Sequence, residues 1–257
     1  MLTLKKSLGQ HFLKDENICR KIVAAIQENP FTCLLEVGPG AGALTKHLLQ
    51  IPEINFKAVE MDREKVEYLV KTYPQLSDKL IHQDFLEIEK PFEERFTVVG
   101  NFPYNISSQI LFRILAWKED VECMVGMFQK EVAQRIKAQE GNKIYGVLSI
   151  LVQAFYKVEY LFEVSEKSFQ PPPKVKSAVI RLLPLKEKLK LKNERDFFLL
   201  VKTAFNQRRK TMRNAVKGLF DAAILEESLF TKRPEQLSVQ DFAALTFKMS
   251  ERTPLEK

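Results

Sequence analysis

The chain has 257 residues, 45% of them hydrophobic, and a formal net charge of +7. A chain of this length can be one α/β domain of conventional size with a small appendix, and it is long enough to bury a core. No stretch is long and apolar enough to span a membrane and residues 1–6 lack a secretory apolar region, so we expect a cytoplasmic protein without a membrane partner. The three cysteines are far apart in apolar contexts and the three histidines lack metal-ligand spacing, which predicts buried thiols and no metal site.

The positive charge is concentrated in one segment. Between Lys186 and Lys217 there are eleven Lys or Arg residues against three acids, an excess larger than that of the whole chain. A surplus spread over the surface is typical of a solubility device, whereas a concentrated one favours a polyanionic partner. The sequence therefore predicts that this segment binds nucleic acid.

The N-terminal residues 4–13 are basic and contain one glycine. A disordered arm is the alternative for the first ten residues. Residues 9–13, however, combine apolar side chains with polar ones in a way that suits a lid folded over a ligand. Asp15 or Asn17 can then cap an amphipathic helix that extends to about Gln27.

Residues 34–44 predict a strand, a glycine turn and the start of a helix near Ala43. Gly38 and Gly40 allow the backbone to pass close to a ligand, and the helix start points free N–H groups at it. The same glycines also satisfy a dinucleotide-binding pattern. The acid before the first glycine and the third glycine, Gly42, favour S-adenosylmethionine, whose sulfonium and amino group are cationic.

Two further strands also end in an acid. Glu60 follows the strand 56–59 at the place where a carboxylate can bind both ribose hydroxyls, and Asp62 is the better cap for the next helix, 63–72. Asp84 follows the strand 79–82 and is next to an apolar neighbour, Phe85, so the pair can provide a carboxylate for an adenine amino group and a wall for its ring. An acid in a simple turn is the alternative for Asp84.

The stretch 98–105 is a short apolar strand that ends in an amide, a proline and an aromatic ring. Pro103 has no backbone donor, so strand pairing must stop there, and we expect residues 105, 107 and 108 to cap the helix 109–117. The Asn101 side-chain oxygen and the Pro103 carbonyl can accept hydrogen bonds from a planar amine, while the Tyr104 ring stacks on its π system. An ordinary strand-to-helix turn is the alternative.

The remaining chain contributes one more candidate and a second domain. Phe169 begins a proline-rich loop, where it can supply a second stacking surface opposite Tyr104 or pack into the core. Pro184 ends the sheet, and residues 194–206, 209–217 and 239–250 predict short amphipathic helices. We therefore expect a catalytic domain over 1–184, including the N-terminal lid, and a helical, basic RNA-binding domain over 185–257.

With these motifs in place, the chain resembles the small-subunit ribosomal RNA adenine N6,N6-dimethyltransferase family almost from end to end. The resemblance rests on residues 8–13, 36–42, 60–62, Asp84, 101–104, 169–175 and 205–210, and the last two stretches make it specific. It implies a class I methyltransferase fold, Rossmann-like with mostly parallel strands and an antiparallel last strand, plus a small helical C-terminal domain. The sequence departs from the family at His11, where Asn is frequent, and at Phe102, where Leu is frequent; both changes are conservative.

The resemblance also implies an activity and a set of site residues. Family members transfer methyl groups from S-adenosylmethionine to two adjacent adenines near the 3′ end of small-subunit (16S) RNA, which gives an immature 30S particle as the partner of a monomeric enzyme. The motif positions place the cofactor against His11, Leu13, Gly38, Glu60, Asp84 and Asn101, with Gly40 in the same turn. The basic residues that we expect to bind RNA are Lys5, Lys6, Arg208, Arg209, Lys210 and Arg213.

Three other functions compete with this interpretation. A large-subunit (23S) RNA adenine methyltransferase of the antibiotic-resistance type shares the superfamily, but the proline-rich loop and the basic 208–210 stretch favour the small-subunit type. A non-catalytic RNA-binding assembly factor would not need the intact glycines, acids and Asn-Phe-Pro-Tyr motif. A nicotinamide oxidoreductase would need an acid/base pair for hydride transfer, and the sequence offers none.

Overall fold

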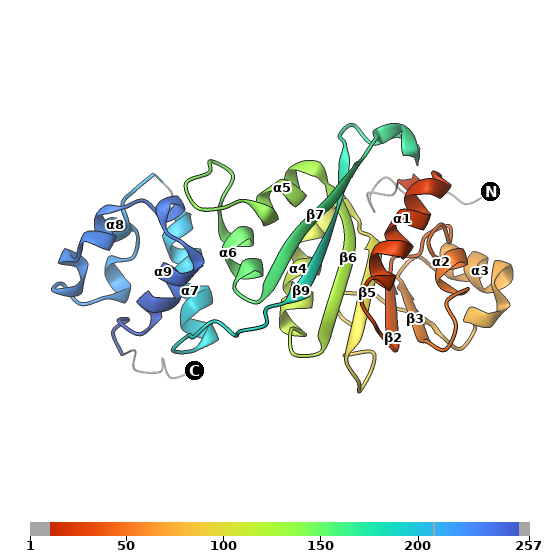
Figure 1. Cartoon of the computed structure of the whole chain (residues 1–257), viewed down its shortest axis with the longest axis horizontal. Coiled ribbons are helices and arrows are strands. Elements are labelled where there is room, and N and C mark those ends of the chain that lie inside the picture. The colour runs from red at the N-terminus through yellow and green to blue at the C-terminus, as the bar shows by residue number, and fades with distance from the viewer. Residues whose placement is uncertain (1–10, 208, 252–257) are drawn as a thin grey trace. The chain divides into compact units, whose positions relative to one another are not determined.

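The computed structural model describes residues 11–207 and 209–251, and these fall into two compact units (Figure 1). The first unit contains the described residues up to Ala133 together with Lys157–Pro184, and the second contains Gln134–Tyr156 and the described residues from Leu185 onward. The sequence-based boundary after residue 184 therefore coincides with one change of unit, but it did not separate residues 134–156 from the first domain. In the described ranges, no helix is long and apolar enough to cross a membrane.

Hydrogen bonds hold residues 134–156 together and join them to the rest of the second unit. On α6 (Val147–Gln153), Ser149 donates to the carbonyl of Arg135 at 2.6 Å, and Gln153 donates to the carbonyl of Ile136 at 2.7 Å. These carbonyls lie at the end of α5 (Lys130–Lys137). The backbone N–H of Gly141 donates to the carbonyl of Glu235 at 2.7 Å, which joins this stretch to the C-terminal part of the chain.

A seven-stranded sheet forms the centre of the first unit, in the order β4-β3-β2-β5-β6-β9-β7. Strands β4, β3, β2, β5 and β6 pair in parallel, and β9 runs antiparallel to β6. This arrangement confirms the predicted class I topology with an antiparallel last strand. The strands are β2 (Cys33–Val37), β3 (Asn55–Glu60), β4 (Leu80–His82), β5 (Phe96–Asn101), β6 (Val121–Gln129), β7 (Tyr156–Val164) and β9 (Ser177–Pro184).

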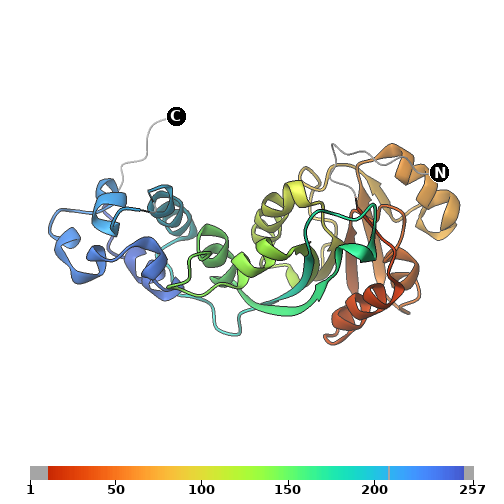
Figure 2. The same ribbon diagram turned by 90° about the horizontal axis from the view of Figure 1, so that it is seen from above.

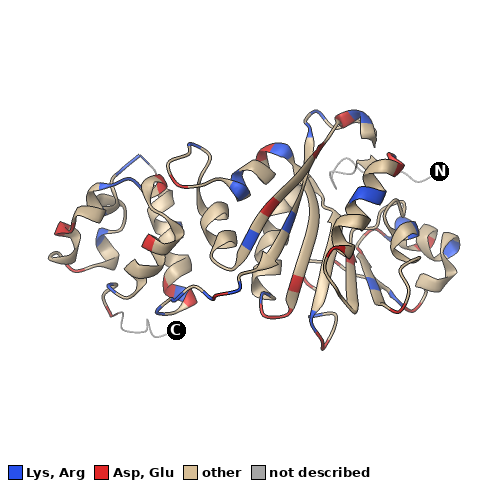
Figure 3. Ribbon diagram, viewed as in Figure 1, with Lys and Arg blue, Asp and Glu red and all other residues tan. Residues whose placement is uncertain are grey.

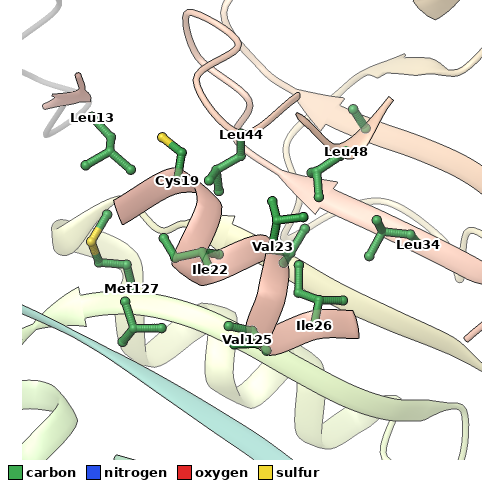
Figure 4. Close-up of a cluster of buried hydrophobic side chains, with 14 of the residues drawn as sticks. Leu13, Cys19, Ile22, Val23, Ile26, Leu34, Leu44, Leu48, Val125 and Met127 are labelled. Carbon is green, nitrogen blue, oxygen red and sulfur yellow. The ribbon is translucent and has the colours of Figure 1, made fainter. Parts of the chain in front are cut away.

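Helices cover both faces of the sheet, and Figure 2 shows α1 (Glu16–Gln27) and α4 (Ser107–Ala116) on opposite sides of it. Asp15 caps α1 as predicted, and the apolar stripe of α1 packs into a buried cluster with side chains of the sheet (Figure 4). The other helices of this unit are α2 (Thr45–Leu48) and α3 (Arg63–Thr72), which Asp62 caps.

The start of α4 differs from the prediction. A 3-10 turn at Tyr104–Ile106 precedes the helix, and the N-cap residue, Ile106, makes no side-chain capping bond. The Ser107 hydroxyl instead donates back to the carbonyls of Pro103 and Tyr104. Local hydrogen bonding within the turn has replaced the expected cap.

Two glycines make room for Phe102 at the end of β5. The ring is 1% exposed, and a Cβ at Gly126 would lie 2.2 Å from it, while one at Gly100 would lie 2.7 Å away. The ring also packs on Phe128, with ring centroids 5.0 Å apart. The large side chain is therefore an anchor that fixes the chain immediately after Asn101.

The second unit contains α7 (Glu194–Asn206), α8 (Met212–Ala215) and α9 (Val239–Thr246), together with α6. The helix expected over 194–206 is confirmed as α7, and its apolar stripe is buried, at Phe197, Leu200, Val201 and Ala204. The helix expected over 209–217 is much shorter, because Thr211 has an extended backbone and the Met212 N–H bonds the carbonyl of Lys232.

Candidate functional site

The carboxyl ends of β2, β3 and β5 open into a cavity of about 250 Å³ within the first unit. This is the edge at which open α/β sheets bind their ligands. The cavity brings together nearly all the residues that the sequence placed near a cofactor or target base: His11, Leu13, Gly38, Gly40, Glu60, Asp84, Asn101, Pro103 and Tyr104. It also includes Glu36, Met61 and Lys65, which were not among the predicted site residues.

The glycine turn after β2 forms one wall of the cavity. Gly38 and Gly40 have φ angles of 68° and 59°, a region that favours glycine, and the Gly38 N–H donates to the carbonyl of Val59 at 2.9 Å. Gly42 has a φ of 82°, and a Cβ there would lie 2.6 Å from the Tyr73 ring. The turn is therefore held by both its backbone conformation and its packing, with Gly38 and Gly40 facing the cavity.

Glu60 lies at the end of β3 and is 7% exposed. Its carboxylate accepts the N–H groups of Gly40 and Asp62 at 3.1 and 3.0 Å. A carboxylate has further lone pairs, so Glu60 can also accept hydroxyl groups of a ligand in the cavity. Asp62 caps α3 as predicted, so the Glu60 carboxylate is not needed as the cap of this helix.

Asp84 combines the two roles that the sequence left open. Its carboxylate accepts the N–H of Leu86 at 2.9 Å, which is turn chemistry, and the residue also lines the cavity. The predicted apolar wall is wrong, because Phe85 is buried against Trp117 with ring centroids 5.6 Å apart. Met61 lines the cavity instead and is 47% exposed.

The Asn101 amide is oriented by the N-terminal segment. Its NH2 group donates to the carbonyl of His11 at 3.0 Å, which leaves the Asn101 side-chain oxygen as an acceptor. The Pro103 carbonyl already accepts the Ile106 N–H and the Ser107 hydroxyl, each at 3.3 Å, so it is shared with its own turn. Asn101 is therefore the better acceptor for an amine.

Tyr104 is held at both its hydroxyl and its ring. The hydroxyl is hydrogen-bonded to that of Ser177, and burial raises the pKa of the Tyr104 hydroxyl. The His11 ring stacks on the Tyr104 ring, with centroids 5.7 Å apart and an interplanar angle of 27°. His11 Nδ1 lies 2.9 Å from the carbonyl oxygen of Pro171. A neutral tyrosine in this position offers an aromatic surface rather than a base.

The prediction that Phe169 stacks opposite Tyr104 is wrong. β1 (Phe12–Leu13) pairs with β8 (Phe169–Gln170), so that Phe169 lies opposite Leu13. Phe169 is 1% exposed and belongs to the apolar core, with no face open for a base. The aromatic neighbour of Tyr104 is His11.

Two buried ionisable residues of the cavity were not assigned as site residues: Lys65, and Glu36, which the sequence had used only as the acid before the first glycine that favours S-adenosylmethionine. Glu36 is 2% exposed and accepts the Thr45 hydroxyl at 2.7 Å, and burial raises the pKa of its carboxyl to about 8. Lys65 is 1% exposed and lies 3.6 Å from the Asp62 carboxylate, with its ammonium 5.2 Å from the centroid of the Phe12 ring. The detectable signal for Glu36 was an acid inside an otherwise apolar strand.

The predicted RNA-binding residues are only partly described. Lys5, Lys6 and Arg208 lie outside the described residues. Arg209 and Lys210 are exposed. Arg213 instead donates to the carbonyl of Leu225 at 2.9 Å and pairs with Glu226 at 3.1 Å, so its guanidinium stabilises its own unit. Over 11–207 and 209–251, no cluster of three His, Cys, Asp or Glu side chains can hold a metal.

The cavity has the chemistry that S-adenosylmethionine needs. Burial keeps the Glu36 carboxyl protonated, but a cation bound beside it would favour the ionised form, which could then compensate the positive charge. Glu60 can accept ribose hydroxyls, and Asp84 can accept an amino group of the adenine. The glycine turn leaves room for a ligand beside the backbone, and the exposed Met61 offers an apolar surface. Together with the sheet topology, these residues define a class I S-adenosylmethionine-dependent methyltransferase.

Comparison with known proteins gives the family. A family model described as ribosomal RNA adenine dimethylase matches residues 1–251, so the chain belongs to that family. A relative in Flavobacterium johnsoniae, named ribosomal RNA small subunit methyltransferase A, is 51% identical, with 95% of each chain covered. A relative of the same name in Bacteroides thetaiotaomicron is 50% identical and covers 96% of this chain and 94% of its own.

Solved structures show the same fold. A dimethyladenosine transferase from Plasmodium falciparum superimposes with a TM-score of 0.74 at 28% identity, over 90% of this chain and 94% of its own. The 23S rRNA methyltransferase ErmE gives a TM-score of 0.67 at 24% identity, over 91% of this chain and 99% of its own. At that identity the likeness to ErmE shows only a common fold.

Proposed function

We propose that this enzyme dimethylates N6 of two adjacent adenines near the 3′ end of small-subunit ribosomal RNA. The observation that carries the proposal is the fixed Asn101 amide, whose oxygen is available beside Tyr104 at the cavity. The family supplies the reaction class. The relatives named small subunit methyltransferase A support the choice of RNA.

The residues around Asn101 account for the chemistry without a strong base. The lone pair of the adenine N6 is delocalised into the ring, so the amine is a poor nucleophile while it stays planar. A hydrogen bond from the N6–H group to the Asn101 oxygen favours a tetrahedral nitrogen. The lone pair of that nitrogen can then attack the methyl carbon. When bound, S-adenosylmethionine would supply the electrophilic methyl group, whose bond to sulfur breaks so that S-adenosylhomocysteine is the leaving group. The methylated nitrogen is cationic and acidic, so its proton can leave afterwards to water.

The aromatic residues hold the target base. An adenine must leave its stack to reach the cavity, and the Tyr104 ring gives it a new stacking surface. His11 stacks on Tyr104 and its carbonyl orients Asn101, so this one residue contacts both groups that the base needs. The second methylation uses the one remaining N6–H for the Asn101 oxygen, so the first methyl group must point away from it.

The partner that fits this reaction is an immature small subunit in the cytoplasm, bound by a monomer of the enzyme. We assign the phosphate contacts to Arg209 and Lys210, which are exposed, and to Lys5, Lys6 and Arg208 by their sequence positions. Arg213 has a structural role instead.

The test is transfer of labelled methyl groups from S-adenosylmethionine to immature small subunits, large subunits and protein-free RNA. We expect transfer to small subunits, with dimethyladenosine at two adjacent positions on mass spectrometry of the digested RNA. Gln75→Ala, at an exposed amide that does not line the cavity, is the control for Asn101→Ala. Equal or preferential transfer to large subunits would contradict the proposed substrate.

A further inference from the structure

A row of lysines follows the connection between β9 and α7, in the second unit (Figure 3). From residue 188 to residue 192 the exposure alternates, with Lys188, Lys190 and Lys192 exposed while Leu189 and Leu191 are partly buried. Lys186 is also exposed, and Glu187 is the one acid in this stretch of sequence. The lysines therefore share an outward face, and the leucines hold the segment to its unit.

This row borders an open groove of about 630 Å³. One wall is the segment from Leu185 to Lys190, and the other is α9, which contributes Gln240, Ala243 and Ala244. The two alanines keep the α9 wall low. The N–H of Lys192 donates to the hydroxyl of Thr246 at 3.0 Å, which fixes the end of the lysine row against the end of α9.

An exposed aromatic ring lies at that end. Phe247 follows Thr246 and is 58% exposed, more than any other large apolar side chain of the described residues. Its backbone angles, −74° and −15°, continue the helix. Phe247 is therefore three, four and seven residues after Ala244, Ala243 and Gln240, on the helical face that lines the groove.

We propose that this groove binds an unpaired stretch of RNA, with its phosphates along the lysines and a base stacked on Phe247. A cationic track beside an exposed aromatic ring is the combination that single-strand-binding proteins use. The four lysines against one acid favour a polyanion over a protein partner, and a paired base would have no free face for the ring. The inference rests on the proposed RNA substrate and adds a contact surface separate from Arg209 and Lys210.

The test measures the affinity of the full chain for a short, fluorescently labelled oligouridylate. Fluorescence anisotropy gives this affinity at several salt concentrations. Lys186→Ala, Lys190→Ala and Lys192→Ala together should lower the slope of log affinity against log salt by about 2. Phe247→Ala should weaken binding about fivefold or more and leave that slope unchanged, because stacking releases no counterions. The matched control removes three charges elsewhere, with Lys71→Ala, Lys79→Ala and Lys232→Ala, and should bind as the parent does.

A second variant reports on stacking directly. In Phe247→Trp the new indole is exposed, whereas the native Trp117 is 8% exposed and provides a constant background. Oligouridylate should quench the new fluorescence, and inorganic polyphosphate should not. The proposal would be overturned if Phe247→Ala bound oligouridylate as tightly as the parent does, or if polyphosphate quenched the Phe247→Trp fluorescence as strongly as oligouridylate does. It would also be overturned if the parent chain self-associated and Phe247→Ala did not, since Phe247 would then be a protein contact. Oligouridylate binding does not require methyl transfer, so failure of the proposed activity would be seen separately, with labelled cofactor and small subunits.

Discussion

The two units use charged residues in opposite ways. In the first unit, Glu36 and Glu60 are 2% and 7% exposed and are fixed by hydrogen bonds around one cavity. In the second unit, Arg209 and Lys210 are exposed to solvent. Interactions of buried ionisable groups are screened by salt much less than those of exposed charges. The comparison teaches that cofactor and catalytic residues should be separable from RNA-binding residues by salt alone.

The largest effect that we expect comes from Asn101→Ala. If the bond to the Asn101 oxygen strengthens by about 3 kcal/mol in the transition state, turnover falls by about 100-fold or more. Cofactor affinity should fall much less, and the salt dependence of RNA binding should not change. Single-turnover methylation by the folded, cofactor-saturated variant measures the effect. A rate near that of the parent would reduce the motif to a structural turn.

Glu36→Gln tests the cost of burying a carboxyl in the first unit. Burial raises the pKa of the Glu36 carboxyl to about 8 in the folded protein, whereas in the unfolded chain the carboxyl has its ordinary pKa of 4.5. Between pH 4.5 and about pH 8 the folded state therefore binds more protons than the unfolded state. In this window the Glu36 carboxyl lowers the free energy of unfolding by about 1.4 kcal/mol for each unit by which the pH rises.

Glutamine cannot ionise, so Glu36→Gln should gain stability relative to the parent as the pH rises through that window. Urea denaturation at several pH values measures this difference. Glu67→Gln is the control, since Glu67 is an exposed acid on α3. A stability difference that stays constant with pH would show that Glu36 is already ionised in the folded protein.

Glu60→Ala should weaken S-adenosylmethionine binding by about 1.5–3 kcal/mol, the range for a hydrogen bond to a charged group. The same carboxylate holds the N–H groups of Gly40 and Asp62, so Glu60→Gln, which keeps an acceptor oxygen, should bind more tightly than Glu60→Ala. Calorimetry on folded variants measures both affinities. Unchanged affinity in Glu60→Ala would remove Glu60 from the cofactor site.

The strand-end residues of the cavity could be predicted because of a simple geometric rule. Parallel strands bring their carboxyl ends to one edge, so Gly38, Glu60 and Asn101 had to lie close together once their strands were recognised. The apolar runs were long enough to identify those strands, and the predicted helix over 63–72 has the observed bounds.

The contacts that complete the site were not predictable because they join distant parts of the chain. Asn101 bonds the carbonyl of His11, 90 residues away, and β1 pairs with β8 across a still longer separation. No local sequence pattern indicates either contact. For that reason the sequence analysis placed Phe169 next to Tyr104, where the structure has His11. Likewise, the basic pattern around Arg213 did not reveal that Glu226 and the Leu225 carbonyl already bind it.

The smallest effect, and the one that completes the comparison, is expected from Arg209→Ala with Lys210→Ala. Each phosphate contact contributes about 0.7 to the salt slope for a single strand and about 0.9 for a duplex, so the pair should lower the slope by about 1.4–1.8. RNA affinity should fall for all sequences alike, because phosphate contacts do not read bases. Cofactor affinity should be unchanged. Titration of small-subunit RNA at several salt concentrations measures the slope for this double variant and for Asn101→Ala. The first should change the slope and the second should not. If the slope stays the same, these two cations are an ordinary solvated surface, and RNA binding by the second unit must depend on other residues.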